Sequence, residues 1–191
     1  MTSDGPRLRA DAQRNVEGIR QAALGVFRAS GLNSPLDEVA RAAGVSKGTI
    51  YHRFGGRQGL IDAVVEELVA ERITGIVTAV SAIEDPVERF ESYLRQIWLL
   101  QYDEPAANDV LLRAMPGSAP LAALCERASE VAAGFLTEAQ ATGSVRDDLT
   151  SEDIYLLIWE RGIIARACTE QPRDGYRQRC EYTLRGLRSA T

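Results

Sequence analysis

Residues Ser34–Leu60 read SPLDEVARAAGVSKGTIYHRFGGRQGL, and this stretch decides the predicted fold. Ser34 is a favourable N-cap residue, and Pro35 suits the first position of a helix. The apolar residues that follow recur at helical spacing and share one face: Leu36, Val39, Ala40 and Ala43. Gly44 suits the end of this helix, because glycine adopts the left-handed conformation without a side-chain clash. The sequence therefore predicts a short helix between Pro35 and Gly44.

A second short helix is predicted to begin almost at once. Ser46 can cap it, and Val45 and Ile50 form a hydrophobic staple that fixes the angle at which the chain enters the helix. Ile50 and Phe54 lie one turn apart and are expected to point inward. Two short helices joined by a tight turn are the form of a DNA-reading helix-turn-helix.

The outward face of this second helix is predicted to be polar or bare. With Ile50 inward, the 3.6-residue period puts Gly48 and His52 on the opposite side. Glycine inside a helix costs about 1 kcal/mol relative to alanine, and close approach of the backbone to a DNA groove is a reason to accept that cost. Basic residues here suit phosphates, which fix register without reading bases. The predicted DNA contacts are Ser34, Ser46, Lys47, Gly48, Thr49, Tyr51, His52, Arg53 and Arg57.

A solvated surface would explain any one of these residues alone. Helix order, capping and outward chemistry agree with one another, and together they favour DNA binding.

The segment GVSKGTIYHRFGGRQGLIDAVVEE, residues 44–67, closely resembles the signature of the TetR family of bacterial transcriptional repressors. In that signature a glycine turn, a short helix ending in an aromatic-basic-aromatic run and a longer helix follow in this order. The resemblance implies an all-α homodimer whose N-terminal domains bind palindromic double-stranded DNA operators and whose C-terminal domains hold a small-molecule effector. One departure is Gly55-Gly56, which stands where a more polar loop is usual, so phosphate contacts are expected from the helix rather than from this loop.

The charge of the chain is divided along its length. Residues 1–60 hold nine Lys and Arg against five Asp and Glu, or +4, whereas residues 61–191 hold 13 against 22, or −9, which together give the net charge of −5. Positive potential is therefore concentrated in the part that carries the helix-turn-helix. Binding that depends on phosphate contacts is expected to weaken as salt rises.

The predicted fold class is all-α, with about nine helices. A first helix is expected over Asp11–Ser30, and a long helix over 57–81. Turn-forming pairs and glycines then divide the tail into five further helices, with breaks at Asp85-Pro86, Glu104-Pro105, Met115-Pro116-Gly117, Gly143 and Gln171-Pro172. We expect a three-helix DNA-binding domain over residues 1–56 and a helical effector-binding and dimerisation domain over residues 57–191.

The tail contains candidates for an effector pocket. Phe90, Leu94 and Ile97 make an apolar stripe that Gln101 and Tyr102 extend with polar groups, and small apolar ligands are usually held by such a mixture. Filling of the core is the alternative role for each of these side chains. The predicted ligand-binding residues are Tyr93, Ile97, Trp98, Gln101, Tyr102, Leu112, Met115, Phe135 and Trp159.

The last two helices are candidates for a dimer interface. Thr150–Asp153 resembles a capping box, and the helix that follows is apolar nearly all round, as expected when both faces are covered. Gly162 and Ala165 would let helices approach closely. By the resemblance, these helices form a four-helix bundle with those of a partner, and a two-fold dimer sets the reading helices about one DNA turn apart. The predicted interface residues are Tyr155, Gly162, Ala165, Tyr176, Cys180, Thr183, Leu184 and Leu187.

An enzyme is not expected. The only histidine is His52, on the reading helix, and there is no GxGxxG, Walker or HExxH pattern. An acidic cluster at Asp147, Asp148, Glu152 and Asp153 could hold a cation, but it better suits the N-terminus of a helix. No cofactor and no metal are predicted.

The location predicted for the protein is the cytoplasm. The start of the chain lacks an apolar signal core, and no segment approaches the roughly 18 apolar residues of a membrane span. Cys125, Cys168 and Cys180 are odd in number and widely spaced, which favours reduced core cysteines over a disulfide, a zinc site or a redox sensor.

Two functions remain open at this point. The first is a repressor that a small, hydrophobic ligand releases from its operator. The alternative is a DNA-binding activator or organiser without a physiological small-molecule effector.

Overall fold

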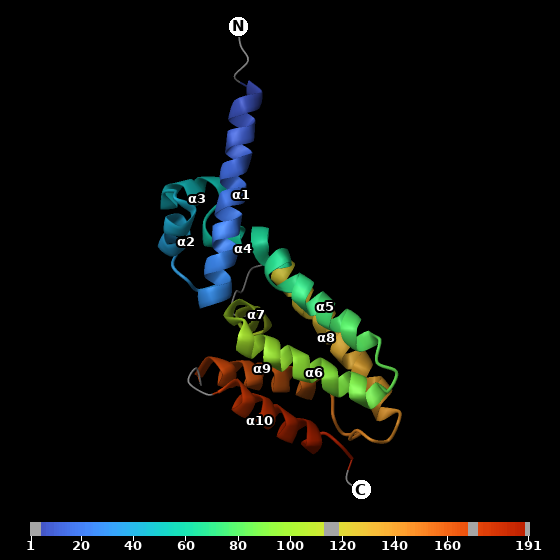
Figure 1. Cartoon of the computed structure of the whole chain (residues 1–191). Helices are drawn as coiled ribbons and strands as arrows, with labels where there is room; N and C mark the ends of the chain where they lie inside the picture. Colours follow the sequence, from blue (N-terminus) through green and yellow to red (C-terminus); the bar gives the residue numbers. More distant parts are fainter. Residues whose placement is uncertain (1–4, 113–118, 168–171, 190–191) are drawn as a thin grey trace.

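The computed structural model describes residues 5–112, 119–167 and 172–189, and the regular structure of these ranges is helical. The N-terminal part contains three helices, α1 (Gly5–Ser30), α2 (Leu36–Ala43) and α3 (Lys47–Phe54). Figure 1 shows α2 and α3 side by side against the long α1, with the two chain ends at opposite ends of the molecule. The first helix begins at Gly5, before the expected start at Asp11. The sequence did not predict these first turns because they contain few apolar residues and so show no helical spacing of apolar positions.

Local signals fix the turn between α2 and α3. Gly44 has φ of 66° and the amide of Val45 donates to the carbonyl of Ala40 at 2.9 Å, which closes α2. The Ser46 hydroxyl accepts from the amide of Thr49 at 3.2 Å, which opens α3. Both predicted caps are confirmed.

The predicted cap on α2 is wrong. Pro35 occupies the N-cap position, with no side-chain capping bond, and the hydroxyl of Ser34 instead donates to the carbonyl of Gly31 at 2.7 Å. Ser34 is buried in this turn. Ser34 therefore closes the turn before α2 and does not cap the helix.

The long helix predicted over 57–81 is continuous but not uniform. It consists of α4 (Arg57–Val65), one π-helical turn (Glu66–Ala70) and α5 (Glu71–Ser81). The spacing of apolar residues predicts a helix but does not reveal the π-helical turn. A single π turn adds one residue to one turn of the helix, and this small shift in spacing cannot be recognised over so few residues.

The C-terminal part has the predicted succession of five helices within the described ranges. They are α6 (Pro86–Asp103), α7 (Pro105–Leu111), α8 (Ala119–Gln140), α9 (Ser151–Ala167) and α10 (Arg173–Gly186). The central helix is α6, which packs against α5, α7, α8, α9 and α10 (Figure 1). Its core side chains have almost no exposed surface: Phe90, Tyr93, Leu94, Ile97 and Trp98.

The capping box predicted at the start of α9 is confirmed. The amide of Thr150 donates to the Asp153 carboxylate at 2.8 Å, and the amide of Asp153 donates to the Thr150 hydroxyl at 3.2 Å. The reciprocal bonds satisfy two donors at the helix start.

Ion pairs tie α10 to α6. Arg95 donates to Glu181 at 2.6 Å, and Arg188 donates to the buried Glu91 at 2.7 Å. One side of α10 packs against α6. Within the described ranges, no helix has both the length and the apolar character needed to cross a membrane.

Two of the three cysteines can be placed. Cys125 and Cys180 are buried, as predicted for core cysteines, and burial raises the pKa of the Cys180 thiol to about 11. Cys168 lies outside the described residues.

Candidate nucleic-acid interface and effector cavities

The helix α3 presents the expected chemistry to the outside. Ile50 is buried, whereas Gly48 and His52 are exposed and Tyr51 keeps 54% of its surface exposed. Lys47 and Arg53 are also exposed. A short helix with a buried apolar side and an exposed mixed side has the geometry of a reading helix.

The glycine pair after α3 has a structural role. Gly55 and Gly56 have φ of 73° and 103°, and a Cβ on Gly56 would lie 3.0 Å from the Tyr51 ring. A larger residue would therefore be strained and would push against Tyr51. The departure from the more usual polar loop leaves room for this exposed aromatic side chain.

Besides Ser46 and Thr49, which bond each other at the start of α3, three of the predicted DNA contacts have other partners. Lys47 pairs with Asp37 at 2.9 Å on the surface, where such a pair is weak and exchangeable. Arg57 is turned inward and donates to the carbonyl of Leu32 at 2.8 Å, contrary to its expected place at the phosphates. Ser34 is buried and cannot reach DNA without a change in its turn.

A narrow space, here called the bundle cavity, lies between α6, α8 and α9 and has a volume of about 30 Å³. Its lining is mainly apolar: Tyr93, Leu111, Cys125, Ala128, Ser129, Ala132, Ser151, Ile154, Tyr155 and Ile158. The Tyr93 hydroxyl donates to the carbonyl of Ala128 at 3.1 Å, and burial raises the pKa of this phenol. Phe135 packs edge-on against Tyr93, with 5.5 Å between ring centroids. Tyr93 thus lines the bundle cavity, and Phe135 packs against it.

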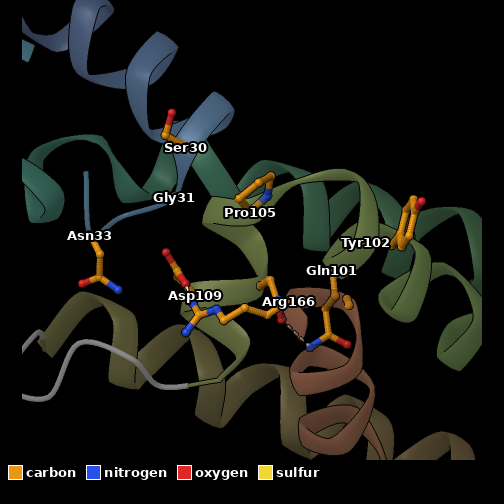
Figure 2. A pocket seen from close by; sticks show the side chains of 10 residues that line it. Ser30, Gly31, Asn33, Gln101, Tyr102, Pro105, Asp109 and Arg166 are labelled. Carbon is orange, nitrogen blue, oxygen red and sulfur yellow. Dashed lines mark hydrogen bonds and ion pairs between the residues drawn. The ribbon is translucent and has the colours of Figure 1, made fainter. Parts of the chain in front are cut away.

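A larger space, here called the junction cleft, lies between the end of α1, α6, α7 and α9 and has a volume of about 430 Å³. Figure 2 shows its lining side chains: Ser30, Gly31, Asn33, Gln101, Tyr102, Pro105, Asn108, Asp109, Ala165 and Arg166. Gln101 and Tyr102, predicted in an apolar effector pocket, belong to this polar cleft instead. Ala165, predicted at a dimer interface, also lines it.

Four other predicted pocket residues lie at neither cavity. Ile97 and Trp98 are fully buried in the core, and Leu112 packs 2.9 Å from the position that a Cβ on Gly162 would take. Trp159 is 39% exposed on the outer side of α9. Helical periodicity placed these residues on apolar faces but could not separate a cavity wall from a filled core or an outer surface. Met115 lies outside the described residues.

Most of the predicted dimer residues face the interior of their own chain, so that prediction is wrong for them. A Cβ on Gly162 would lie 2.5 Å from both Asn108 Oδ1 and Gln101 Nε2. Tyr155 lines the bundle cavity, and Thr183 is half-buried beside Arg161, which donates to its hydroxyl. The remaining four are buried on the side of α10 that packs against α6: Tyr176, Cys180, Leu184 and Leu187.

The peptide at Leu32 is held from both sides. Its amide donates to the buried carboxylate of Asp109 on α7 at 2.6 Å, and its carbonyl accepts from Arg57 on α4. Arg166 on α9 forms an ion pair with the same carboxylate. Gly31 has φ of 83°, and a Cβ there would lie 2.6 Å from Asp109, so only glycine fits. Sequence reasoning missed Asp109, although consecutive polar residues in the apolar segment PAANDVL are an available signal.

Comparison with known proteins agrees with this arrangement. Residues 19–64 match the family described as bacterial regulatory proteins, tetR family, and residues 85–189 match the C-terminal domain of SbtR-like transcriptional regulators. The chain belongs to the TetR family of transcriptional regulators. The N-terminal helix-turn-helix and the C-terminal helical domain are those of this family, whose members regulate transcription and are not enzymes.

This TetR-family chain is 31% identical over 129 residues to the HTH-type transcriptional regulatory protein RaaS of Mycobacterium tuberculosis. That alignment covers 67% of this chain and 58% of the relative, so it spans little more than half of the curated protein.

Two solved structures share the fold. The TetR regulator SCO0520 of Streptomyces coelicolor aligns with a TM-score of 0.55 and 27% identity, covering 92% of this chain and 99% of its own. FadR of Bacillus subtilis, solved in complex with stearoyl-CoA, aligns with a TM-score of 0.65 and 18% identity, covering 92% of this chain and 98% of its own.

Proposed function

We propose that this regulator is a repressor that binds a palindromic operator as a homodimer and leaves it when a small hydrophobic ligand enters the bundle cavity. The observation that carries the proposal is the exposed face of α3, with Gly48, Tyr51 and His52 outward over a buried Ile50. In this proposal residues 1–56 form the DNA-binding domain, residues 57–191 form the effector and dimerisation domain, and the protein acts in the cytoplasm.

The DNA contacts come from α3 and the residues beside it. Tyr51 and His52 reach base edges, and Gly48 lets the helix backbone approach the groove closely. Lys47 and Arg53 meet phosphates, and Lys47 exchanges Asp37 for a phosphate on binding. The positive excess of residues 1–60 supports this placement.

The dimer surface is the outer side of α9 and α10. Leu156, Trp159 and Ile163 recur at helical spacing and stay exposed on α9, and Tyr182 is exposed on α10. Large apolar side chains gathered on adjacent helices mark an interaction surface. A second copy of this chain is the occupant that a TetR-type regulator requires, since two-fold symmetry places the reading helices at about 34 Å, one turn of DNA.

The ligand site is the bundle cavity. Its apolar walls suit an acyl chain, and the structurally similar FadR was solved with stearoyl-CoA. A cavity of about 30 Å³ must widen to admit such a ligand, which separates α6 from α8 and α9. Because Asp109 joins α7 to the Leu32 amide, movement in this region is carried to α1 and hence to α3.

The narrowness of the bundle cavity also favours a second candidate, a DNA-binding activator or organiser whose core stays filled. The two candidates differ in whether a ligand changes operator affinity.

The test begins with selection of bound fragments from randomised DNA. An enriched palindrome is then used to measure release by straight-chain fatty acids of increasing length, together with the melting temperature of the protein. Release with a rise in melting temperature supports the repressor, whereas an operator that stays bound with every chain length favours the second candidate. If the selected DNA site is not palindromic, the proposal that a two-fold symmetric dimer binds the operator is contradicted.

Matched variants on α8 locate the ligand. Ala132→Leu fills the bundle cavity and should abolish release, whereas Ala122→Leu lies on the exposed side of α8 and should leave it intact.

A further inference from the structure

The junction cleft joins the two domains. Its walls include Ser30, Gly31 and Asn33 from the N-terminal part, together with residues of α6, α7 and α9 (Figure 2). It is more than ten times as large as the bundle cavity, at about 430 Å³ against about 30 Å³. A volume of this size suits a small organic molecule.

Two amide side chains form a directed chain that ends at Gln101, one of the residues lining the cleft. Asn108 donates to the carbonyl of Gly162 at 2.9 Å, and Gln101 donates to the Asn108 carbonyl oxygen at 3.2 Å. A backbone carbonyl can only accept, so it fixes the orientation of both amides. The group left at the end of the chain is therefore Gln101 Oε1, which is an acceptor.

This acceptor lacks a donor. Gln101 is 1% exposed, and among the described residues its Oε1 has no hydrogen-bond partner. An unsatisfied buried carbonyl is costly, and a ligand that supplies an N–H group removes the cost.

The only charged side chain buried at the cleft, among the described residues, is also an acceptor. Asp109 is 3% exposed and has one oxygen on the Leu32 amide and the other paired with Arg166. Arg166 is half-exposed, at 50%, on a long side chain near the end of α9. Figure 2 shows the two side chains facing each other at the cleft. The anion is thus fixed and buried, while its cation can swing into solvent.

We propose that the junction cleft is a binding site for a small organic cation rich in N–H donors, such as an amidinium. The ligand takes the place of Arg166 on the Asp109 carboxylate and donates to Gln101 Oε1, and the ring of Tyr102 offers an aromatic face at the cleft wall. The site differs from the proposed apolar effector cavity in place and in chemistry, and it does not depend on the repressor mechanism.

Benzamidine is the probe, because its planar amidinium matches a carboxylate as the Arg166 guanidinium does. Calorimetric titration of the full-length protein should show one benzamidine bound per chain, with benzamide and benzoate binding at least roughly tenfold more weakly. Equal or tighter binding of benzoate overturns the proposal, since the cleft would then be an anion site.

Removal of Arg166, which competes with the ligand for Asp109, gives a test in which the direction of the change in benzamidine affinity decides the outcome. Arg166→Ala should tighten benzamidine binding by roughly tenfold, because the ligand no longer displaces a cation from Asp109. Arg173→Ala is the matched control, since Arg173 has the same exposure and pairs with Asp103 at 2.7 Å at the end of α6, outside the lining of the cleft. Unchanged or weaker binding by Arg166→Ala contradicts the proposal.

A second variant removes the open acceptor with little change in shape. Gln101→Met should weaken benzamidine binding by roughly tenfold; because it also removes the donor to Asn108 Oδ1, it should lower the melting temperature, and binding is measured on the folded protein well below that temperature. Ala132→Leu, in the bundle cavity, should leave benzamidine binding unchanged, so failure of the apolar effector site and failure of the cation site are separated. Loss of benzamidine binding in Ala132→Leu would show that benzamidine binds in the bundle cavity, which contradicts the proposed site in the junction cleft.

Discussion

The helix pair α2–α3 and the helix pair α9–α10 were both assigned inner and outer faces from sequence, with opposite results. On α3 the inward Ile50 and the outward His52 lie where the period put them. On α10 the residues expected to face a partner, such as Tyr176 and Leu184, are buried inside their own chain. The difference lies in how each pair of helices separates polar from apolar residues.

On α2–α3 the contrast is local. Gly44 and Ser46 fix where the helices end and begin, and polar residues stand opposite apolar ones. On α9, apolar residues occupy nearly the whole circumference, so the period gives the helix but not the side that faces inward. The inward sides of α9 and α10 are set by their packing against α6, and for α10 also by the long-range pair of Arg95 with Glu181, which a single helix cannot reveal.

Two adjacent residues of α9 give the sharpest test of this orientation. Ile163 is 42% exposed on the proposed dimer surface, so Ile163→Asp should weaken dimerisation by about a hundredfold or more, because an unpaired charge would be buried between the subunits. Sedimentation at several concentrations measures the effect. Leu184→Ala, on the inward side of α10, is the control and should lower stability while the folded protein remains dimeric. An Ile163→Asp protein with wild-type dimer affinity would place the interface elsewhere.

The neighbouring residue should respond in another way. A Cβ on Gly162 meets Asn108 and Gln101 at 2.5 Å, so Gly162→Ala should lower the free energy of unfolding by about 2 kcal/mol. Gly134→Ala on the exposed side of α8 meets nothing within 4 Å and should raise stability by up to about 1 kcal/mol. Urea unfolding measures both. If the two alanines shift stability equally, Gly162 does not lie in the close contact described.

Substitutions on the exposed face of α3 should change DNA binding and no other property. Tyr51→Ala and His52→Ala should each weaken operator binding about tenfold, through loss of base or groove contacts, with the dimer and its melting temperature unchanged. Fluorescence anisotropy with the selected operator measures the loss, and Arg127→Ala on the exposed side of α8 is the control. Wild-type affinity in both α3 variants would remove this helix from the DNA interface.

The smallest effect is expected at the capping box of α9. Hydrogen bonds from Thr150 hold the pKa of Asp153 below its usual range, so this carboxylate stabilises the fold above its unfolded pKa of about 3.9 and the contribution is lost as pH falls through the lower folded value. Asp153→Asn should therefore lower the melting temperature by about 2 °C at pH 7 and by less at pH 3. Asp147→Asn is the control. A difference in melting temperature between Asp153→Asn and the wild type that grows toward acid pH would contradict the lowered pKa of Asp153.

The candidate sites were only partly predictable. Gln101 and Tyr102 were predicted to bind a ligand because polar tips on an apolar helix face are visible in the sequence, and both line the junction cleft. Their chemical setting was not visible, since it depends on Asp109, Asn108 and Arg166. The bond from the Leu32 amide to Asp109 joins residues 77 positions apart, and no local pattern encodes such a pairing.

The two-sided hold on the Leu32 peptide limits how freely the domains of this regulator can be exchanged. A chimera that joins residues 1–56 to the C-terminal domain of another protein would lose Arg57 and Asp109 together, leaving the amide and the carbonyl of the buried Leu32 without these partners. The reverse chimera would bury the Asp109 carboxylate without its backbone donor. Domain transplants should therefore carry the Gly31–Leu32 turn, Arg57 and Asp109 as one unit, even though these residues are distributed over one turn and two separate helices.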